Sequence, residues 1–374
     1  METAVSSSWV RSLRAPRRTI DPWHSLGQLW EEERTPDGGS IPALTVFLAG
    51  AECPFTCVFC DLWRETLDGP TPPGALPEQL RQALAAAGTI PSPAALKLYN
   101  ASNFFEPRAV PLEDEDEILA LAALFARVTV ECHPRLIGDR CLRFAERLAG
   151  RLEVAMGLET VHPEALPRLN KGLTLEDFDR AAGLLRQAGI GLRAFVLVGC
   201  PFVPLDETVD WAVRSAAHAF EQGAERVSLI PVRGGNGALE ALGFTPPRLD
   251  QLEEALERCL DLPGIPGITT VDLWDARRFA GCPECADGRL ARLDRMNRSG
   301  LLEGREECAK CRPSGADPHS PTPLSPPPPH RPGERGSNSF LRQASPSSPV
   351  RSGGRLGEEG RGDEGQPAED ANSS

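Results

Sequence analysis

The chain has 374 residues, of which 40% are apolar, so it is long enough for one large domain with a substantial buried core. It contains no run of about 18 apolar residues, and no membrane-spanning helix is therefore predicted. The formal net charge of −13 argues against a broadly basic surface for nucleic acid, although a local basic patch would still allow RNA to bind.

The 11 cysteines fall largely into groups with metal-site spacing. Arg11, Arg14, Arg17 and Arg18 are not followed by the apolar stretch of a secretory signal. Disulfides persist in oxidising compartments, whereas metal-binding thiols need a reducing one. We therefore expect a cytoplasmic protein that has no membrane partner.

Residues 1–40 are predicted to be an N-terminal leader that packs on the core. Trp23, Leu26 and Trp30 have the spacing of one helical face, so a helix is expected there. No chemistry is assigned to this leader.

Residues 41–276 alternate between short apolar runs and helical segments, and they are predicted to form the core. Strands are expected at 43–49, 95–99, 128–131, 152–158, 192–198 and 227–231, with a further strand at 269–274. Helices are expected at 77–87, 113–126, 139–149, 175–187 and 206–221. This alternation predicts an α/β fold of parallel strands with right-handed crossovers. No glycine-rich dinucleotide motif follows the first strand, so we predict a partial, TIM-like (β/α)6 barrel with its site at the carboxyl ends of the strands.

The loop after the first strand carries Cys53, Cys57 and Cys60 at C-x3-C-x2-C spacing, with Phe59 just before the third cysteine. Three thiolates leave a four-iron cluster one ligand short, because a cluster held by protein alone takes four cysteines. Structural zinc would need a fourth ligand nearby, such as a second close cysteine pair. The spacing therefore indicates a 4Fe-4S cluster with one open iron.

This motif resembles the signature of the radical S-adenosylmethionine (SAM) superfamily. The resemblance implies that the open iron binds the amino and carboxylate groups of SAM, and that the reduced cluster cleaves SAM to a 5′-deoxyadenosyl radical. It also implies an electron donor such as flavodoxin or ferredoxin. Phe59 takes the place of the aromatic residue of the motif and is expected beside the cofactor.

Polar residues follow the later strands, where a barrel would place its site. The resemblance implies that Asn100 and Ser102 receive the amino group of SAM and that the backbone at Gly199 lies against adenine. Glu131 and Glu159 are suited to bind ribose hydroxyls or to orient a substrate. The Asn170–Gly172 stretch is a candidate to close the same pocket, and the polar stretch from Gly234 to Gly237 is a candidate to contact the substrate or the adenosyl group.

Plainer interpretations of these residues stay open. Asn100 and Ser102 also suit an ordinary polar loop, and residues 170–172 suit a turn. His133 is a candidate proton carrier, but a lone histidine in a loop is more often an ordinary polar residue. Cys200 is a candidate hydrogen-atom donor, but unligated cysteines usually behave as small buried apolar residues.

Residues 277–312 are predicted to form a small metal-binding extension. Cys282 and Cys285 form one C-x2-C pair, and Cys308 and Cys311 form another. Paired motifs of this kind fit tetrahedral zinc, while a second iron–sulfur cluster is the alternative. Residues 313–374 are rich in Pro, Ser, Gly and Arg and are predicted to be a disordered tail.

Taken together, Cys53–Trp63, Glu131–Pro134, Gly157–Glu159, Asn170–Gly172 and the terminal cysteine pairs resemble one branch of this superfamily. The branch contains the catalytic subunit of Elongator and the radical SAM subunit of archaeosine synthase. The resemblance implies a radical SAM enzyme acting on a tRNA base or a modified nucleoside, and small molecules or peptides stay open as substrates. The alternatives are a non-catalytic zinc or iron–sulfur protein that binds RNA or a partner, and an iron–sulfur redox sensor that never cleaves SAM.

Overall fold

The computed structural model describes residues 5–264, 267–305 and 307–311. The predicted tail at 313–374 therefore lies outside the described residues. The strands are β1 (Gly27–Arg34), β2 (Ser40–Phe47), β3 (Ala95–Tyr99), β4 (Arg127–Glu131), β5 (Arg151–Glu159), β6 (Gly191–Val198), β7 (Arg226–Pro231) and β8 (Ile268–Val271). The helices are α1 (Ser7–Ser12), α2 (Ala75–Ala87), α3 (Glu115–Ala122), α4 (Asp139–Arg147), α5 (Ala165–Arg168), α6 (Leu175–Gln187), α7 (Thr208–Glu221), α8 (Ala238–Ala241), α9 (Leu249–Leu260) and α10 (Ala286–Ser299).

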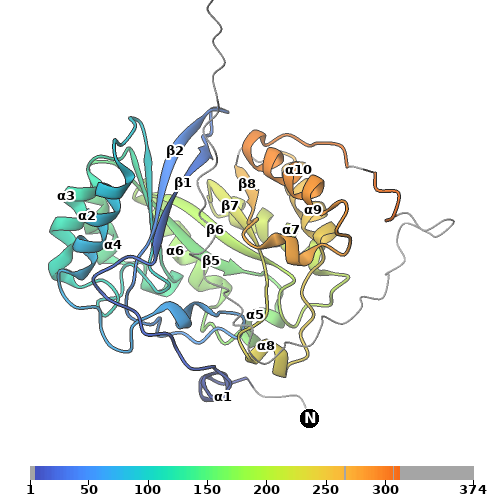
Figure 1. Cartoon of the computed structure of the whole chain (residues 1–374), viewed down its shortest axis with the longest axis horizontal. Helices are drawn as coiled ribbons and strands as arrows, with labels where there is room; N and C mark the ends of the chain where they lie inside the picture. Colours follow the sequence, from blue (N-terminus) through green and yellow to red (C-terminus); the bar gives the residue numbers. More distant parts are fainter. Residues whose placement is uncertain (1–4, 265–266, 306, 312–374) are drawn as a thin grey trace, which may run out of the picture. The chain divides into compact units, whose positions relative to one another are not determined.

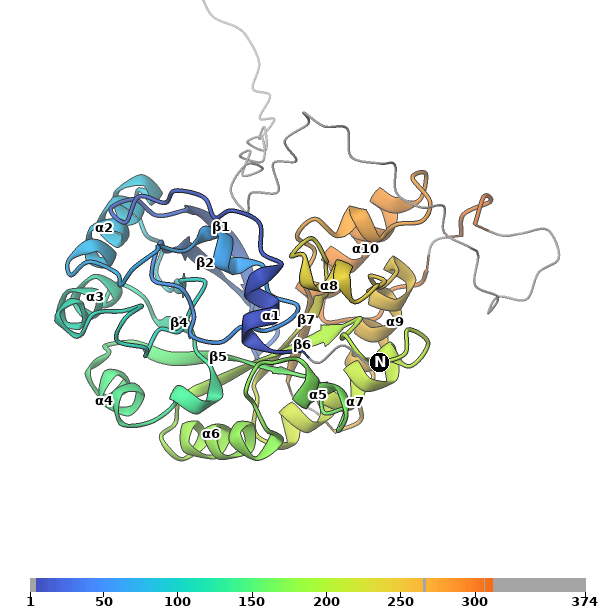
Figure 2. The same ribbon diagram turned by 90° about the horizontal axis from the view of Figure 1, so that it is seen from below.

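All eight strands form one sheet, whose spatial order is the chain order from β1 to β8. Strands β2 to β8 pair in parallel, while β1 pairs with β2 in antiparallel fashion. Helices follow the outside of the curved sheet in an arc, as Figures 1 and 2 show. The predicted α/β partial barrel is confirmed, and its expected seventh parallel strand is β8.

The predicted helix at Trp23, Leu26 and Trp30 is wrong. Residues 27–34 form β1, and Trp23 and Trp30 are 45% and 38% exposed instead of packing inward. The strand turns two glutamates toward the inside of the half-barrel, where Glu33 pairs with Lys97 at 2.8 Å and with Arg193 at 2.5 Å. These partners come from β3 and β6, which are distant in the sequence. Because a glutamate takes an inward position, residues 27–34 lack the alternation of apolar and polar residues that would predict a strand.

The interior at the amino ends of the strands is held by buried ion pairs. Glu153 on β5 accepts hydrogen bonds from Arg193 at 2.8 Å and from Arg226 at 3.1 Å. Burial raises the pKa of Glu153, but the surrounding guanidinium groups lower it below its ordinary value on balance. Breaking such a pair would be costly, because it leaves a buried charge without a partner. We therefore assign a structural role to this end of the half-barrel and look for the functional site at the other end.

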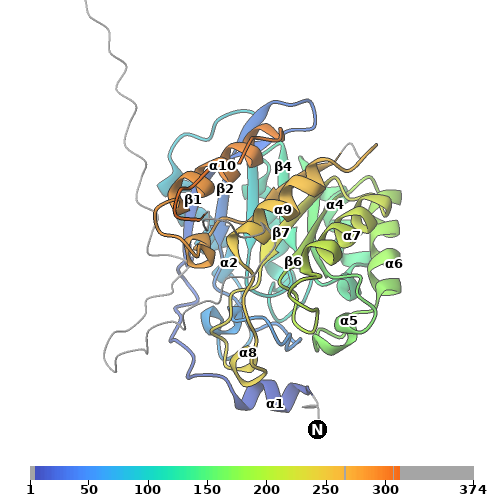
Figure 3. The same ribbon diagram turned by 90° about the vertical axis from the view of Figure 1, so that its right-hand side faces the viewer.

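Helix α10 contacts both edges of the sheet, β1 and β8. The Asn297 side chain accepts from the backbone N–H of Val271 and donates to its carbonyl, both at 2.8 Å, as a neighbouring strand would. At the end of the helix, a Cβ on Gly300 would collide with Arg34 of β1. Figure 3 shows α10 beside β1. The helix thus covers the exposed edge of β8.

No helix within the described residues is long and apolar enough to cross a membrane.

Candidate metal centre at the carboxyl edge

The three cysteines of the predicted cluster motif lie in the loop that leaves β2. All three are partly buried. Burial raises the pKa of the Cys57 thiol to about 12 and that of Cys60 well above its ordinary value. Burial also raises the pKa of Cys53, although a hydrogen bond from Asn103 Nδ2 to Cys53 Sγ at 3.2 Å opposes the shift. A cationic metal group would favour the thiolate forms in this setting.

Asparagines from three other loops hold this cluster loop. Asn103, after β3, contacts Cys53 as above and accepts from the backbone N–H of His133 at 2.7 Å. Asn170, after α5, has a positive φ and donates to the carbonyl and hydroxyl oxygens of Thr56 at 2.8 and 2.7 Å. Asn236, after β7, donates to the carbonyl of Val58 at 2.6 Å. The irregular loop is therefore positioned by side chains from separate parts of the chain.

A buried ion pair lies beside the cysteines. Lys171 Nζ and Glu159 Oε1 are 2.5 Å apart, and both side chains are less than a tenth exposed. Burial lowers the pKa of Lys171, but Glu159 and the neighbouring Cys57 raise it above its ordinary value on balance. A Cβ on Gly157 would lie 1.9 Å from Glu159 Oε1 and 2.3 Å from Lys171 Nζ, so only glycine leaves room for the pair.

Glu131 joins the ends of β3 and β4. Its carboxylate accepts from the backbone N–H of Asn100 at 2.8 Å. Burial raises the pKa of Glu131 to about 7. In the same loop the buried Asn100 Nδ2 and Ser102 Oγ have no hydrogen-bond partner. Because buried polar atoms are normally paired, these two atoms fit a polar ligand.

His133 packs against the cluster loop. Its ring stacks on Phe55 with centroids 3.8 Å apart and planes inclined by 15°. Nδ1 accepts from the backbone N–H of Arg135, so Nε2 carries the proton and donates to the Lys171 carbonyl at 3.1 Å. Burial and the charge of Lys171 lower the pKa of His133 to about 3. At neutral pH it is therefore an uncharged packing residue.

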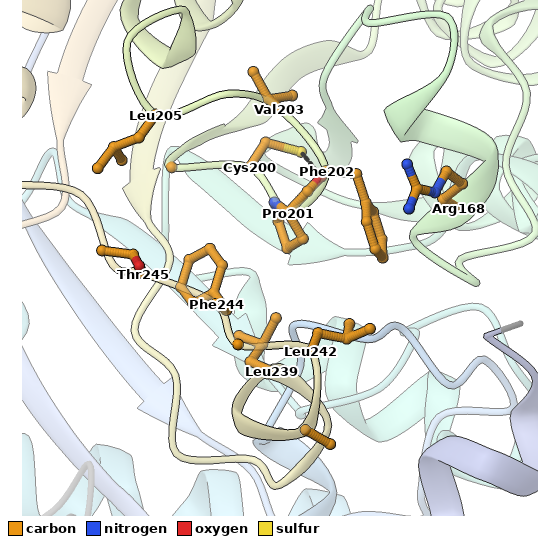
Figure 4. A pocket seen from close by; sticks show the side chains of 13 residues that line it. Arg168, Cys200, Pro201, Phe202, Val203, Leu205, Leu239, Leu242, Phe244 and Thr245 are labelled. Atoms are coloured by element: carbon orange, nitrogen blue, oxygen red, sulfur yellow. Dashed lines mark hydrogen bonds between the residues drawn. The ribbon is translucent and has the colours of Figure 1, made fainter. Parts of the chain in front are cut away.

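Gly199 and Cys200 line a pocket of about 490 Å³ between the β6–α7 loop and the residues around α8. Figure 4 shows the apolar side chains of this pocket, with Arg168 beside Phe202. The Arg168 guanidinium lies 4.0 Å from the Phe202 ring centroid. A Cβ on Gly199 would lie 2.5 Å from Pro247 Cδ, so the glycine allows the 245–248 segment to pack against the end of β6. Phe59 packs in the adjoining apolar cluster, together with Leu239.

The second cysteine group lies at the start of α10, where Cys285 is the N-cap residue. The Sγ atoms of Cys282, Cys285, Cys308 and Cys311 all lie within 4.8 Å of one another. The Cys282–Cys308 sulfurs are 3.9 Å apart and the Cys285–Cys311 sulfurs 3.5 Å apart. Hydrogen bonds from the backbone of Cys285 and Glu284 lower the pKa of Cys282 to about 7. A single tetrahedral zinc ion, with Zn–S bonds of about 2.3 Å, places its sulfurs about 3.8 Å apart.

Within residues 5–264, 267–305 and 307–311, no other group of three His, Cys, Asp or Glu ligand atoms is this tight. Cys53, Cys57 and Cys60 are not part of such a group. An iron–sulfur cluster does not need one, because each cysteine binds a different iron. The two cysteine groups thus differ in geometry as well as in number.

The structure brings most of the predicted site residues to one edge of the sheet. Glu131, Glu159, Asn100, Ser102 and the three motif cysteines lie on loops or strand ends there. Gly199 is at the same edge but packs against Pro247. The contacts made by Asn103, Lys171 and Asn236 were not predicted. Asn103 and Asn236 lie in polar loops after strands, and Lys171 lies within the Asn170–Gly172 stretch. These positions in the sequence were the only indication of their contacts.

No family model matches the sequence. An uncharacterised protein of Methanocaldococcus jannaschii is 27% identical over 172 residues, which are 43% of this chain. The chain spans about half of that protein's length, 47%. Archaeosine synthase subunit beta of Methanosarcina acetivorans is 25% identical over 254 residues, covering 63% of this chain and 72% of that protein.

Among solved structures, Elp3 of Methanocaldococcus infernus has a TM-score of 0.46 and 16% sequence identity, over 63% of this chain and 61% of that one. The archaeosine synthase subunit is the relative that the sequence motifs indicate. This similarity agrees with the branch that the sequence motifs indicate.

Proposed function

We propose that this protein is a radical SAM enzyme. A 4Fe-4S cluster on Cys53, Cys57 and Cys60 supplies, when bound and reduced, the electron that cleaves SAM to a 5′-deoxyadenosyl radical, which abstracts hydrogen from a substrate. The observation that carries the proposal is the placement of these thiols: three, partly buried, at C-x3-C-x2-C spacing in the loop that leaves β2 at the carboxyl edge of a half-barrel. Flavodoxin or ferredoxin is the proposed electron donor.

The residues around the cysteines fit the cofactor. The unpartnered Asn100 Nδ2 and Ser102 Oγ offer polar atoms to the amino acid end of SAM. Lys171 offers a buried ammonium for its carboxylate, and the adjacent Glu159 offers a carboxylate for its ammonium or ribose. The Asn103 side chain donates to Cys53 Sγ, which stabilises negative charge on that sulfur. Burial of the loop keeps water from the reacting groups.

The test is anaerobic reconstitution of the full chain with iron and sulfide. We expect a brown protein with three or four irons at the motif, reduction by dithionite, and release of 5′-deoxyadenosine when SAM is added. A colourless protein would favour the non-catalytic zinc alternative. A cluster that binds but releases no 5′-deoxyadenosine under reducing conditions would favour a redox sensor.

We further propose that the substrate is a tRNA base or a modified nucleoside. The similarity to archaeosine synthase subunit beta supports this class. The net charge of −13 requires that contacts to RNA come from a local patch. Incubating the reconstituted enzyme with bulk tRNA and SAM, and with free nucleosides in a parallel reaction, tests the idea. Deoxyadenosine release above the substrate-free rate is expected with one of them, and no increase with either contradicts it.

The second cysteine group is proposed to hold one structural zinc ion. The sulfur separations of 3.5 and 3.9 Å support a mononuclear tetrahedral site more than a second cluster. Four protein ligands close such a site, so no position is left for a substrate. Metal analysis of the Cys57→Ser variant, which lacks the proposed cluster, separates the two: about one zinc per chain is expected, and residual iron with sulfide would indicate a cluster.

A further inference from the structure

The first residues described by the structure lie across the loops of the candidate site. Residues 5–18, called here the N-terminal clamp, include α1. Figure 2 shows α1 lying over the centre of the arc of helices. Val10 is 3% exposed and packs in the apolar cluster that contains Val58 of the cysteine loop. Ser7 Oγ accepts from Thr56 Oγ1 at 2.8 Å, and a Cβ on Gly237 would collide with the Leu13 carbonyl.

Two arginines of this clamp hold the residue that precedes the first motif cysteine. Arg14 Nη1 donates to Glu52 Oε1 at 2.6 Å, and Arg17 Nη2 donates to Glu52 Oε2 at 2.5 Å. Both carboxylate oxygens are thereby used, and all three side chains are less than a quarter exposed. Arg17 Nη1 also donates to the Leu67 carbonyl at 2.7 Å, beyond the last cysteine. Arg14 lies over the Trp63 ring at 4.8 Å.

These contacts matter because the loop has little regular structure of its own. From Ala51, which forms an isolated bridge to Leu67, the chain runs to Asp61 without a helix or an extended strand. Cys53 stands near the start of this stretch, and the Asn103 side chain reaches its sulfur from the β3 loop. The paired arginines hold the side chain of Glu52, one residue before Cys53. Charge-assisted hydrogen bonds that are partly shielded from water are strong enough to hold such a loop in one conformation.

We propose that Arg14 and Arg17 are positioning residues of the site, which act through Glu52 to hold Cys53 in its ligand position. The ligand role of Cys53 rests on the function proposed above. The position of Cys53 in the folded chain does not depend on a bound metal and can be tested without one. By this proposal the N-terminal clamp is part of the cluster site, although no chemistry was predicted for it from the sequence.

The experiment compares the full chain with an Arg14→Gln/Arg17→Gln variant. In iron-free, reduced protein, the rate of Cys53 alkylation by iodoacetamide is measured by peptide mass spectrometry. Loss of both charge-assisted contacts is expected to raise this rate about tenfold, and to speed iron release from the reconstituted protein to a chelator by a similar factor. An Arg14→Lys/Arg17→Lys variant retains the charges and is expected to recover most of the protection.

The matched control removes two arginines from surface ion pairs elsewhere, in an Arg81→Gln/Arg147→Gln variant. It is expected to leave both rates within about twofold of the parent, because exposed pairs contribute little. Should the Arg14→Gln/Arg17→Gln variant fail to fold by circular dichroism, Glu52→Gln tests the same contacts with a smaller change. Cys53 alkylation at the parent rate in a folded variant overturns the proposal. If the parent protein binds no cluster, but Cys53 is still alkylated faster in the Arg14→Gln/Arg17→Gln variant than in the parent, the enzyme function is overturned. The positioning role of the two arginines then stands.

Discussion

The two cysteine groups of this protein use the same kind of ligand in different surroundings. At the carboxyl edge, three thiols lie in a loop held by side chains from several other loops, and burial raises the pKa of Cys57 to about 12. At the start of α10, four sulfurs lie within 4.8 Å of one another. Backbone hydrogen bonds lower the pKa of Cys282 to about 7, while burial raises the pKa values of Cys285 and Cys311. The first site is made by the tertiary fold and the second by two short local motifs.

The difference indicates two roles. A group of four close thiolates satisfies a tetrahedral ion and joins the start of α10 to the segment after it. Three thiols leave a cluster one protein ligand short, and the unpartnered Asn100 Nδ2 and Ser102 Oγ at the same edge of the sheet fit a polar ligand. We therefore propose that the local site serves stability and that the site that depends on the whole fold serves chemistry.

The largest effect is expected from Cys57→Ser. Removing one of three thiolates should abolish both the iron content of the motif and 5′-deoxyadenosine release, because a cluster with two protein ligands is not retained. Iron analysis and chromatography of the reaction mixture measure these losses. Cys141→Ser, at a buried cysteine outside both groups, is the matched control and should keep both properties. Equal turnover in the two variants would remove the proposed role of the motif.

Lys171→Met should have the next largest effect. It leaves the Glu159 carboxylate buried without its cation, which costs about 3–5 kcal/mol of unfolding free energy. Denaturant titration of the iron-free protein measures this loss. A Lys171→Met/Glu159→Gln variant removes both charges and should regain most of the stability. A double variant as unstable as the single one would show that the pair is not the cause.

Cys285→Ser should affect stability but not chemistry. We expect loss of the zinc ion and about 2 kcal/mol of unfolding free energy, with faster hydrogen exchange in α10. 5′-Deoxyadenosine release by the folded variant should persist. Complete loss of that release in a variant that still binds iron at the first motif would contradict the separation of the two sites.

The smallest effect is expected at Glu131, whose pKa is raised to about 7 by burial. A carboxyl with a raised pKa stabilises the fold below its unfolded pKa of about 4.5, and this stabilisation is lost as the pH rises through about 7. Between pH 5 and pH 8 the parent should therefore lose about 2–4 °C more in melting temperature than Glu131→Gln. An equal loss of melting temperature in both proteins between pH 5 and pH 8 would contradict the raised pKa of Glu131.

The sequence predicted the parts of the fold that depend on local pattern. The parallel strands from β2 to β8 were found because buried strands are short apolar runs between helices. Strand β1 was missed because its inward residues include Glu33, which is stabilised by Lys97 and Arg193 from distant strands. Helices α9 and α10 were not anticipated either.

The same limit applies to the site. The cysteine spacings and the polar residues after the strands could be read directly from the sequence. The contacts of Asn103 with Cys53 and of Arg14 with Glu52 join residues 50 and 38 positions apart. Such pairings depend on how the loops meet, which no local pattern encodes.

The most direct test is electron paramagnetic resonance of the anaerobically reconstituted, dithionite-reduced protein, recorded with and without SAM. The account predicts the signal of a reduced four-iron cluster that changes when SAM is added, because one iron is left free to bind it. A signal that SAM does not alter, or a reduced protein that contains no iron, would contradict the central claim.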